Sequence, residues 1–425
     1  MYPSKSTQFL LPSSSNLTAM KSIPRNQFLS NLSQIISVPN NYITSLFIKT
    51  KSKLFPKYRR NSLSFKLPQS TTLMEHLNIL LSSIHSIHFD IFYFKSSFFN
   101  STSFFDLSTN SKLLFLLSKQ IFSFWNLLPS YISESKLKTF TYKLSKMYNN
   151  NPYHNIIHAC DVLQTTHVIL KEGDFLSKTI LNREDVFAIL IAAMIHDIKH
   201  PGVSNNYLIS SYNKLALKYN NISPLENMHL YEGIKLINKL CLFETINEYK
   251  KEIIKKRMIQ MILGTDGTQH EKVINAVKCK IDEIIKSNNT IQGDKLLKEY
   301  LNSSANVFQL QQHLMTLILH CADISNPAEK YENIYSKWTE YIMKEFFNEG
   351  DLEREKGLPM NFLCDRNTTI IQKGQINFIK GIVLPTFLLL NRLIPSIKGY
   401  VNNLYENIEI YNKQLEEMND KNNQS

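Results

Sequence analysis

Glycine and proline are scarce in this chain. Its 425 residues include 11 glycines and 14 prolines, whereas 43% of the residues are apolar. A β-sandwich or β-barrel changes direction every few residues and needs more of both turn-forming residues. The composition therefore disfavours a many-turned β fold. We expect an all-α fold with long helices, polar loops and at least one large core.

Cysteine pairs, phosphate-binding glycine loops and long apolar runs are also missing. The five cysteines are odd in number and widely spaced, with no CxxC pair, which excludes a disulfide framework and a zinc finger. We find no internal repeat and no glycine-rich loop of a nucleotide-binding α/β fold. Polar residues interrupt the apolar runs near Leu113 and Ile379, so we expect no membrane span. A reducing, cytoplasmic location is expected.

No acidic residue precedes Glu75, although the whole chain carries a formal net charge of +12. We expect residues 1–70 to form a basic, disordered arm rich in Ser, Asn and Lys. Contact of this arm with an anionic membrane, or organelle targeting, is the alternative to a solvated tail, so peripheral membrane association remains open. The rest of the chain is nearly balanced, and no nucleic-acid partner is expected. The sequence does not determine the oligomeric state.

Helical periodicity starts at Leu73, where apolar residues recur at three- and four-residue steps. We expect one catalytic domain over residues 71–415, followed by a polar C-terminal tail over 416–425. Turn-forming residues separate the periodic segments. Helices are predicted at Leu113–Trp125, Leu137–Met147, Val186–Ile195, Met228–Leu240, Ile253–Leu263, Val273–Ile285, Phe308–His320, Ile334–Phe347 and Phe378–Leu393.

Histidine and aspartate gather at the edges of three apolar segments. His154 and His158 are four residues apart, a spacing that places two side chains on one helical face. His196 and Asp197 end the second segment, and Asp323 ends the third. Each element alone also fits a polar surface, a core histidine or a helix cap. Together they supply two imidazoles and two carboxylates, a set suited to zinc with open positions for water.

Five motifs in order carry a resemblance to a known family. They are HNIIHACDVLQ, HDIKHPGVSNNYL, LHCADISNP, EFFNEGDLEREKGLP and GQINFIKGIVLPTF. The segment from about Leu73 to Leu415 resembles the catalytic domain of the class I cyclic nucleotide phosphodiesterases. The resemblance implies a compact multi-helix, HD-type metal phosphohydrolase that opens 3′,5′-cyclic nucleotides (cAMP or cGMP) to 5′-monophosphates and so ends their signalling.

The resemblance also implies roles for residues around the metals. Zinc would be bound by His158, His196, Asp197 and Asp323, and Asp197 would bridge to a second cation, magnesium or manganese. Two such ions activate a water molecule and neutralise phosphate oxygens. His154 would be the general acid that protonates the ribose O3′, with Glu226 orienting it. The resemblance further suggests that His200, Thr265 and Asp266 contact metal-bound water, although each also fits an ordinary hydrogen-bonded role.

Substrate binding is implied for a separate group of residues. Gln375 matches the family's purine-binding glutamine, whose amide offers one donor end and one acceptor end. Phe378 and Ile342 would clamp the two faces of the base, although Phe378 also fits core packing. Asn326 and Tyr153 complete the expected substrate-binding set. Base preference does not follow, because a side-chain amide serves either purine.

Three positions depart from the family's pattern. Met228 replaces a common histidine, Lys199 replaces a common acidic residue, and Gly374 replaces a common serine. Lys199 would add positive charge beside the metals. Two other functions remain open: a sensor that binds cyclic nucleotides without hydrolysing them, and a metal phosphohydrolase for other phosphate substrates. The complete His and Asp set argues against the sensor, and the purine clamp argues against the other hydrolase.

Overall fold

The computed structural model describes residues 79–99, 108–287 and 291–424. Every regular element in these ranges is a helix, which confirms the predicted all-α class. The expected arm over 1–70 and the first residues of the expected domain lie outside the described residues. Of the expected polar C-terminal tail, residues 416–424 form the end of helix α19 (Lys398–Gln424).

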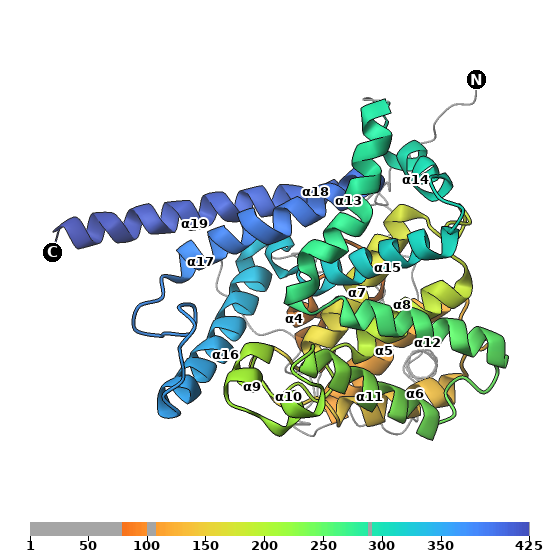
Figure 1. Ribbon diagram of the computed structural model, residues 1–425, viewed down its shortest axis with the longest axis horizontal. Coiled ribbons are helices and arrows are strands. Elements are labelled where there is room, and N and C mark those ends of the chain that lie inside the picture. Colours follow the sequence, from red (N-terminus) through yellow and green to blue (C-terminus); the bar gives the residue numbers. More distant parts are fainter. Residues whose placement is uncertain (1–78, 100–107, 288–290, 425) are drawn as a thin grey trace, which may run out of the picture. The chain divides into compact units, whose positions relative to one another are not determined.

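Three helices are buried almost all round and form the centre of the fold (Figure 1). They are α7 (Ile156–Gly173), α8 (Arg183–Ile195) and α15 (Val307–Asp323). In α8 every residue from Asp185 to Ile195 is buried. A helix that is apolar on all sides must be enclosed by neighbours. α8 accordingly packs against both other central helices and against α12 (Glu248–Leu263).

The remaining helices surround this centre. Each of the nine predicted segments overlaps a helix, although several helices begin earlier because their polar first turns carry no apolar period. The segment Phe378–Leu393 covers the end of one helix, a π-helical segment and a second helix. The outer helices are α4 (Ile91–Phe99), α5 (Ser108–Phe124), α6 (Glu134–Ser145), α9 (Asn205–Ser210), α10 (Lys214–Lys218), α11 (Pro224–Lys239), α13 (His270–Ser287), α14 (Gly293–Asn302), α16 (Ser336–Glu355), α17 (Ile371–Phe378) and α18 (Leu384–Leu393).

The C-terminal helices include one apolar stretch that meets the length and composition of a membrane span. It covers Ile371–Leu393, and 44% of its most apolar window is buried. This stretch comprises α17, a five-residue π-helical segment and α18, and α19 packs against both helices. A core helix passes the same test, so the stretch is weak evidence for a span. In Figure 1 the end of α19 extends beyond its neighbours.

A buried ion pair joins α8, α12 and α15. Arg257 on α12 donates from Nε to Asp185 on α8 at 3.0 Å, and both side chains are 1% exposed. The same guanidinium donates to the backbone carbonyl of Phe308 on α15 at 2.6 Å. Asp185 also accepts from the backbone of Asn182, which closes a capping box at the start of α8. The pair therefore fixes the relative positions of the helices whose far ends carry the site.

Replacing Arg257 by methionine should destabilise the fold strongly. The change leaves the Asp185 carboxylate buried without its partner, which typically costs about 3–5 kcal/mol. Urea denaturation followed by circular dichroism measures the loss. Arg354→Met is a matched control because Arg354 pairs with acids at the surface, and it should change stability little. Equal effects of the two replacements would contradict the proposed role of the buried pair.

Candidate metal centre and catalytic site

Three helix ends bring four ligand-type side chains to one point. His158 lies in the first turn of α7, whose N-cap Asn155 accepts from the backbone N–H of Ile157 at 2.7 Å. His196 is the residue after α8, and Asp197 follows it. Asp323 is the last residue of α15. Residues that are far apart in the sequence thus form one cluster, in which the ligand atoms all lie within 4.8 Å of one another.

The spacing within this cluster fits a tetrahedral cation site. The His158 and His196 Nε2 atoms are 3.3 Å apart, and each lies 3.1 to 3.2 Å from Asp323 Oδ1. Asp197 Oδ2 lies 3.5 Å and 3.2 Å from the same two nitrogens. Ligand atoms about 2.0–2.1 Å from a tetrahedral zinc ion are about 3.3 Å from one another. The donor set and its spacing therefore fit a divalent metal.

Hydrogen bonding also leaves the right atoms free for a metal. The Nδ1 atom of His196 bonds to the Ala193 carbonyl at 2.9 Å, so it carries the proton and leaves Nε2 bare. The buried Asp197 Oδ2 has no hydrogen-bond partner. A buried carboxylate oxygen without a partner carries a high free-energy cost. A bound cation removes that cost.

The local electrostatics favour positive charge at the same point. Asp197 and Asp323 lie at the C-terminal ends of helices, where the helix dipole disfavours anions and favours cations. Burial lowers the pKa of His196, but the two carboxylates more than offset this and raise its pKa well above the usual value. Burial keeps the pKa of His158 below the usual value, in spite of Asp323. The cluster thus attracts either a proton or a metal cation.

Asp197 is shared with a second group of candidate ligands. Its Oδ1 atom lies 3.7 Å from Nε2 of His229 on α11, and Asp197, His200 and His229 form a buried cluster of their own. His229 Nδ1 bonds to the Ile198 carbonyl at 2.6 Å, which fixes the ring. One carboxylate between two groups of donors is the arrangement that a pair of metal ions requires.

The prediction that His154 and His158 share a helical face is wrong. Helix α7 begins at Ile156, so His154 lies in the turn before its N-cap. The two rings still approach with centroids 5.9 Å apart, and His154 stacks on His200 at 3.9 Å. The turn therefore places His154 beside the cluster, although not for the reason that the spacing suggested.

The expected partner of His154 is also wrong. Its Nδ1 atom bonds to Glu345 on α16, whose second oxygen accepts from the backbone N–H groups of Tyr153 and His154 at 3.0 and 3.2 Å. Glu226 instead accepts from the Asn205 amide at 3.0 Å. Burial lowers the pKa of His154, but the Glu345 carboxylate outweighs it and raises that pKa to about 9. The Glu345 carboxylate therefore favours the protonated form of His154.

Lys199 does not point its charge at the metal cluster. Its Nζ atom lies 3.1 Å from Glu232 on α11. The carboxylate of Glu232 therefore neutralises the positive charge that Lys199 brings where the family commonly has an acidic residue. The residue adopts φ +63°, a left-handed conformation in the turn after α8. Gly202 in the same turn has φ +78° and donates its N–H to His200 Nδ1 at 3.1 Å. The turn orients His200.

The expected base-binding residues lie on α16 and α17. The amide oxygen of Gln375 accepts from the Tyr335 hydroxyl at 2.6 Å, and the Gln375 side chain is buried. Phe378 is 38% exposed, which disfavours core packing as its role. Ile342 lies one helical turn after Trp338, which contacts Tyr153 edge-to-face at 5.4 Å. No contact in the described residues tests the clamp itself, which stays a prediction.

Tyr153 and Asn326 belong to one buried hydrogen-bond chain. The Tyr153 hydroxyl donates to Asn326 Oδ1, and the Asn326 amide donates to Asp161 at 2.9 Å. Burial raises the pKa of Asp161 to about 7, in spite of the Asn326 hydrogen bond. This chain fixes the orientation of the Asn326 amide, so any contact of Asn326 with a substrate would use an amide already held by the protein.

Thr265 and Asp266 bond to nearby protein groups. Thr265 donates to the Ile262 carbonyl at 2.8 Å, and Asp266 accepts from the Ser223 hydroxyl at 2.6 Å. Asp266 lines a small polar cavity of about 210 Å³ together with Asn205. Their predicted contact with metal-bound water remains a prediction.

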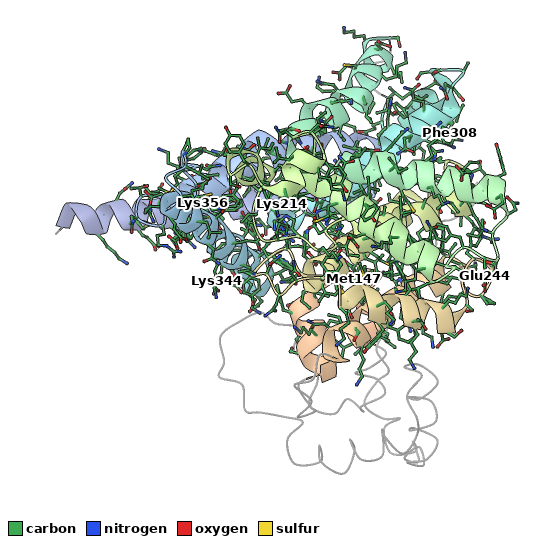
Figure 2. All side chains as sticks on the ribbon, turned by 60° about the horizontal axis from the view of Figure 1, so that its bottom comes forward. Met147, Lys214, Glu244, Phe308, Lys344 and Lys356 are labelled. Atoms are coloured by element: carbon green, nitrogen blue, oxygen red, sulfur yellow. The ribbon has the colours of Figure 1, made fainter. Side chains whose placement is uncertain are left out.

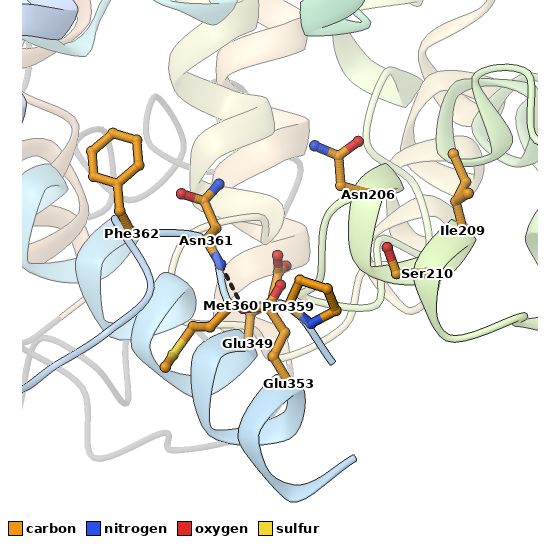
Figure 3. Close-up of a pocket in the computed structure, with 9 residues that line it drawn as sticks. All are labelled: Asn206, Ile209, Ser210, Glu349, Glu353, Pro359, Met360, Asn361 and Phe362. Carbon is orange, nitrogen blue, oxygen red and sulfur yellow. Dashed lines mark hydrogen bonds between the residues drawn. The ribbon is translucent and has the colours of Figure 1, made fainter. Parts of the chain in front are cut away.

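One cavity is lined by residues of α9, α16 and the segment that follows α16 (Figure 3). It measures about 600 Å³. Glu349 and Glu353 contribute carboxylates to its wall, and the backbone N–H of Asn361 donates to Glu353 at 3.2 Å. Ser204 donates to Glu349 through its backbone N–H and its hydroxyl, which connects the turn after α8 to α16. None of the lining residues belongs to the predicted site set.

Two functional residues were missed from the sequence. Glu345 opens the EFFNEGDLEREKGLP motif, which carried the resemblance without a role for its first residue. His229 lies one helical turn after Glu226, so the i, i+3 rule could have paired it with that residue on one face. Both become visible only when α11 and α16 are placed against the turn after α8.

The comparisons with known proteins agree with this geometry. The family model described as 3′5′-cyclic nucleotide phosphodiesterase matches residues 153–404, more than half of the chain. The chain belongs to this family. Its resemblance to class I catalytic domains is thereby confirmed, and the helical fold is the one that the family's metal phosphohydrolase domains share.

Two curated relatives and one crystal structure illustrate the match. The chain is 36% identical over 271 residues to 3′,5′-cyclic-AMP phosphodiesterase 4C of Rattus norvegicus, covering 63% of this chain and 48% of the relative. It is 36% identical over 290 residues to the probable 3′,5′-cyclic-AMP phosphodiesterase pde-4 of Caenorhabditis elegans, covering 67% and 41%. The phosphodiesterase domain of the RhoPDE fusion protein from the choanoflagellate Salpingoeca rosetta superposes with a TM-score of 0.67 at 26% identity, covering 81% and 99%. The chain therefore spans less than half the length of these curated relatives.

Removal of metal should lower the melting temperature of this protein. A cation bound only by the folded state stabilises it by mass action, so a strong chelator should lower the melting temperature by several degrees, about 5 °C or more. Asp323→Ala should melt lower and lose the response to chelator. His313→Gln, outside the three candidate ligand groups, should keep the response. A wild-type melting curve that chelator leaves unchanged would argue against a structural metal here.

Proposed function

We propose that this chain hydrolyses 3′,5′-cyclic nucleotides to 5′-nucleoside monophosphates. The observation that carries the proposal is that a set of candidate metal ligands lies close to a candidate proton donor. The candidate metal ligands His158, His196, Asp197 and Asp323 lie next to His154, whose protonated form Glu345 favours. Membership of the phosphodiesterase family supports the same reaction.

We propose zinc for the cluster of His158, His196, Asp197 and Asp323, and magnesium or manganese for a second site that Asp197 would share, with water as its other ligands. Imidazole nitrogens suit zinc, while a bridging carboxylate with waters suits the harder ions. Asp197 would serve both. When bound, the metals supply an activated water molecule and neutralise the phosphate oxygens.

The protein's own residues account for the departure of the ribose O3′. An alkoxide is a poor leaving group until it is protonated, and a positioned imidazolium supplies that proton. His154 is held by Glu345 through Nδ1, so Nε2 is the atom free to donate. His200 stacks on its ring at 3.9 Å, and the pKa of His200 is well below the usual value because of burial and the neighbouring imidazolium. Glu345 thus favours the protonated form of His154, whereas burial and the charge on His154 favour the neutral form of His200.

Among the cyclic nucleotides, we propose cAMP as the preferred substrate. The curated relatives described above are named as cyclic-AMP phosphodiesterases, which supports this choice. We infer that the hydrogen bond from the Tyr335 hydroxyl to the Gln375 amide oxygen favours one of the amide's two orientations. A fixed amide presents one donor and acceptor pattern and so discriminates between the two purines. A sensor that only binds the nucleotide is not favoured, because the groups needed for hydrolysis are all present.

The direct test is hydrolysis of cAMP and cGMP in separate reactions, with the 5′-monophosphates quantified. Metal-replete protein should turn over cAMP, and protein stripped by chelator should not. His154→Gln should lower kcat by about 10²–10⁴-fold while retaining bound metal, because only the proton donor is removed. Absence of turnover with metal bound would refute the hydrolase and leave a sensor or another phosphate substrate.

The pH dependence should identify Glu345 as the group that keeps His154 protonated. The raised pKa of about 9 keeps the acid form present up to about that pH. Glu345→Gln removes the charge that raises the pKa, so the alkaline limb of the kcat/KM profile should move to lower pH. The loss of activity should be largest near pH 8–9 and smallest near pH 6. An alkaline limb that stays in place would show that another group titrates there.

Tyr335→Phe should weaken base discrimination. Without the hydroxyl the Gln375 amide can adopt both orientations. The ratio of kcat/KM for cAMP to that for cGMP should therefore fall roughly tenfold, because one hydrogen bond that favours a single orientation is lost. Separate kinetics on the two substrates measure the ratio. Tyr331→Phe is the control, because Tyr331 bonds to Gln414 instead of Gln375. An unchanged ratio in Tyr335→Phe would exclude orientation of the amide as the source of preference.

A further inference from the structure

A row of unpaired lysines lies on α10 and α11. Lys214 and Lys218 are exposed on α10, and Lys235 and Lys239 are exposed on α11. Lys214 is labelled in Figure 2. Among the described ion pairs, none includes these four ammonium groups. We use the name α10–α11 surface for these four lysines together with the exposed side chains of Tyr212, Leu217, Ile222 and Tyr231.

The sequence around this surface lacks free negative charge. No Asp or Glu occurs between Asp197 and Glu226. Glu226 itself is buried, and Glu232 is paired with Lys199 at 3.1 Å. The four lysines are therefore uncompensated by acids on their own segment, and the surface is complementary to an anionic partner.

Large apolar side chains are also exposed on α10, on α11 and in the segments that flank α10. Tyr212 is 81% exposed, Ile222 is 68% exposed and Leu217 is 55% exposed. Tyr231 on α11 is half exposed, and the Lys218 and Lys235 ammonium groups lie 4.7 and 5.4 Å from its ring centroid. These contacts place lysines of α10 and α11 around one aromatic ring. Cations and apolar groups thus occur side by side.

The exposed side chains project from a packed base. On the opposite side of α10, Ala216 packs with Tyr207, Leu208 and Leu225 in a small core. Lys214, Leu217 and Lys218 follow the i, i+3, i+4 spacing of a single helical face. Leu217 is therefore exposed by its helical position, and not because α10 fails to pack. The surface is a fixed feature of the fold.

We propose that the α10–α11 surface docks the protein onto an anionic phospholipid bilayer. Lysines near a bilayer are attracted to acidic headgroups, while tyrosine, leucine and isoleucine side chains enter the boundary between headgroups and acyl chains. Lysine stems can lie along that boundary with their ammonium groups in water. A nucleic acid would use the lysines and the tyrosines but would gain little from Leu217 and Ile222. The combination therefore favours lipid.

The basic N-terminal sequence supports the same partner. Ten Lys and Arg residues and no acid occur before Glu75. One weak membrane signal gives reversible binding, and stable attachment requires a second. The folded domain would supply one signal and this segment the other. The proposal concerns location, and it does not depend on the proposed hydrolase activity.

Vesicle co-sedimentation of the full chain tests the charge requirement. Wild-type protein should bind vesicles of 70% phosphatidylcholine and 30% phosphatidylserine, and not pure phosphatidylcholine. Replacing Lys214, Lys218, Lys235 and Lys239 by glutamine should lower the partition coefficient by roughly a hundredfold, since each lysine near the surface contributes several-fold. The control variant replaces Lys295 and Lys298 on α14, which are also exposed, and should lose little. Equal binding by the fourfold variant and wild type would overturn the proposal, even if another segment binds lipid.

An introduced tryptophan tests contact with the bilayer directly. Both native tryptophans, Trp125 and Trp338, are buried, so a new one reports its own surroundings. In a Leu217→Trp variant the added emission should shift to shorter wavelength with anionic vesicles and be quenched by brominated lipid. Tyr249→Trp is the control, because Tyr249 is 77% exposed on α12 between Glu248 and Glu252. Its emission should not respond.

The outcomes of the two experiments are distinct. Sedimentation without a shift at position 217 would mean that the chain binds lipid through another segment, which contradicts the assignment to this surface. Binding of the lysines to an acidic protein or to RNA, with no binding to anionic vesicles, would contradict the choice of lipid. Circular dichroism and the chelator-dependent melting temperature verify that each variant is folded.

Discussion

The site depends on the close approach of two histidines and two aspartates, which is favourable only when a positive charge lies among them. Two imidazole Nε2 atoms and two carboxylates meet within 3.1 to 3.5 Å, at the C-terminal ends of two helices and the first turn of a third. Without positive charge the carboxylates would repel each other, and the helix dipoles would add to the cost. The geometry is therefore organised for a metal.

The buried helices are the structure's means of holding this arrangement. Helix α8 is apolar on all sides and brings His196 and Asp197 out of the core at its end. Arg257 ties the start of α8 to α12 and α15, so the helix that carries Asp323 is fixed relative to the helix that carries Asp197. Packing far from the metals thus sets distances within the cluster. A ligand atom displaced by 1 Å would leave the range that a tetrahedral ion accepts.

Much of this structure follows from local patterns in the sequence. Apolar spacing locates the main helices because each has a face to bury. The His and Asp motifs lie at helix ends because turn-forming residues precede the first motif and follow the other two. His154 shows the limit of such reasoning: its spacing from His158 fits a helix, but the helix begins two residues later. The partner of His154 could not be derived locally, because Glu345 is 191 positions away along the chain. Only the packing of α16 against the turn before α7 decides that Glu345, and not Glu226, meets His154.

The most direct measurement of the central claim is anomalous X-ray diffraction from crystals of protein grown without added chelator. Data collected on both sides of the zinc absorption edge should give a single strong difference peak within about 2.0–2.3 Å of the His158 and His196 Nε2 atoms and of carboxylate oxygens of Asp197 and Asp323. A second, lighter ion should lie on the far side of Asp197. Absence of density at the four-residue cluster, or an ion held elsewhere by other side chains, would contradict the account.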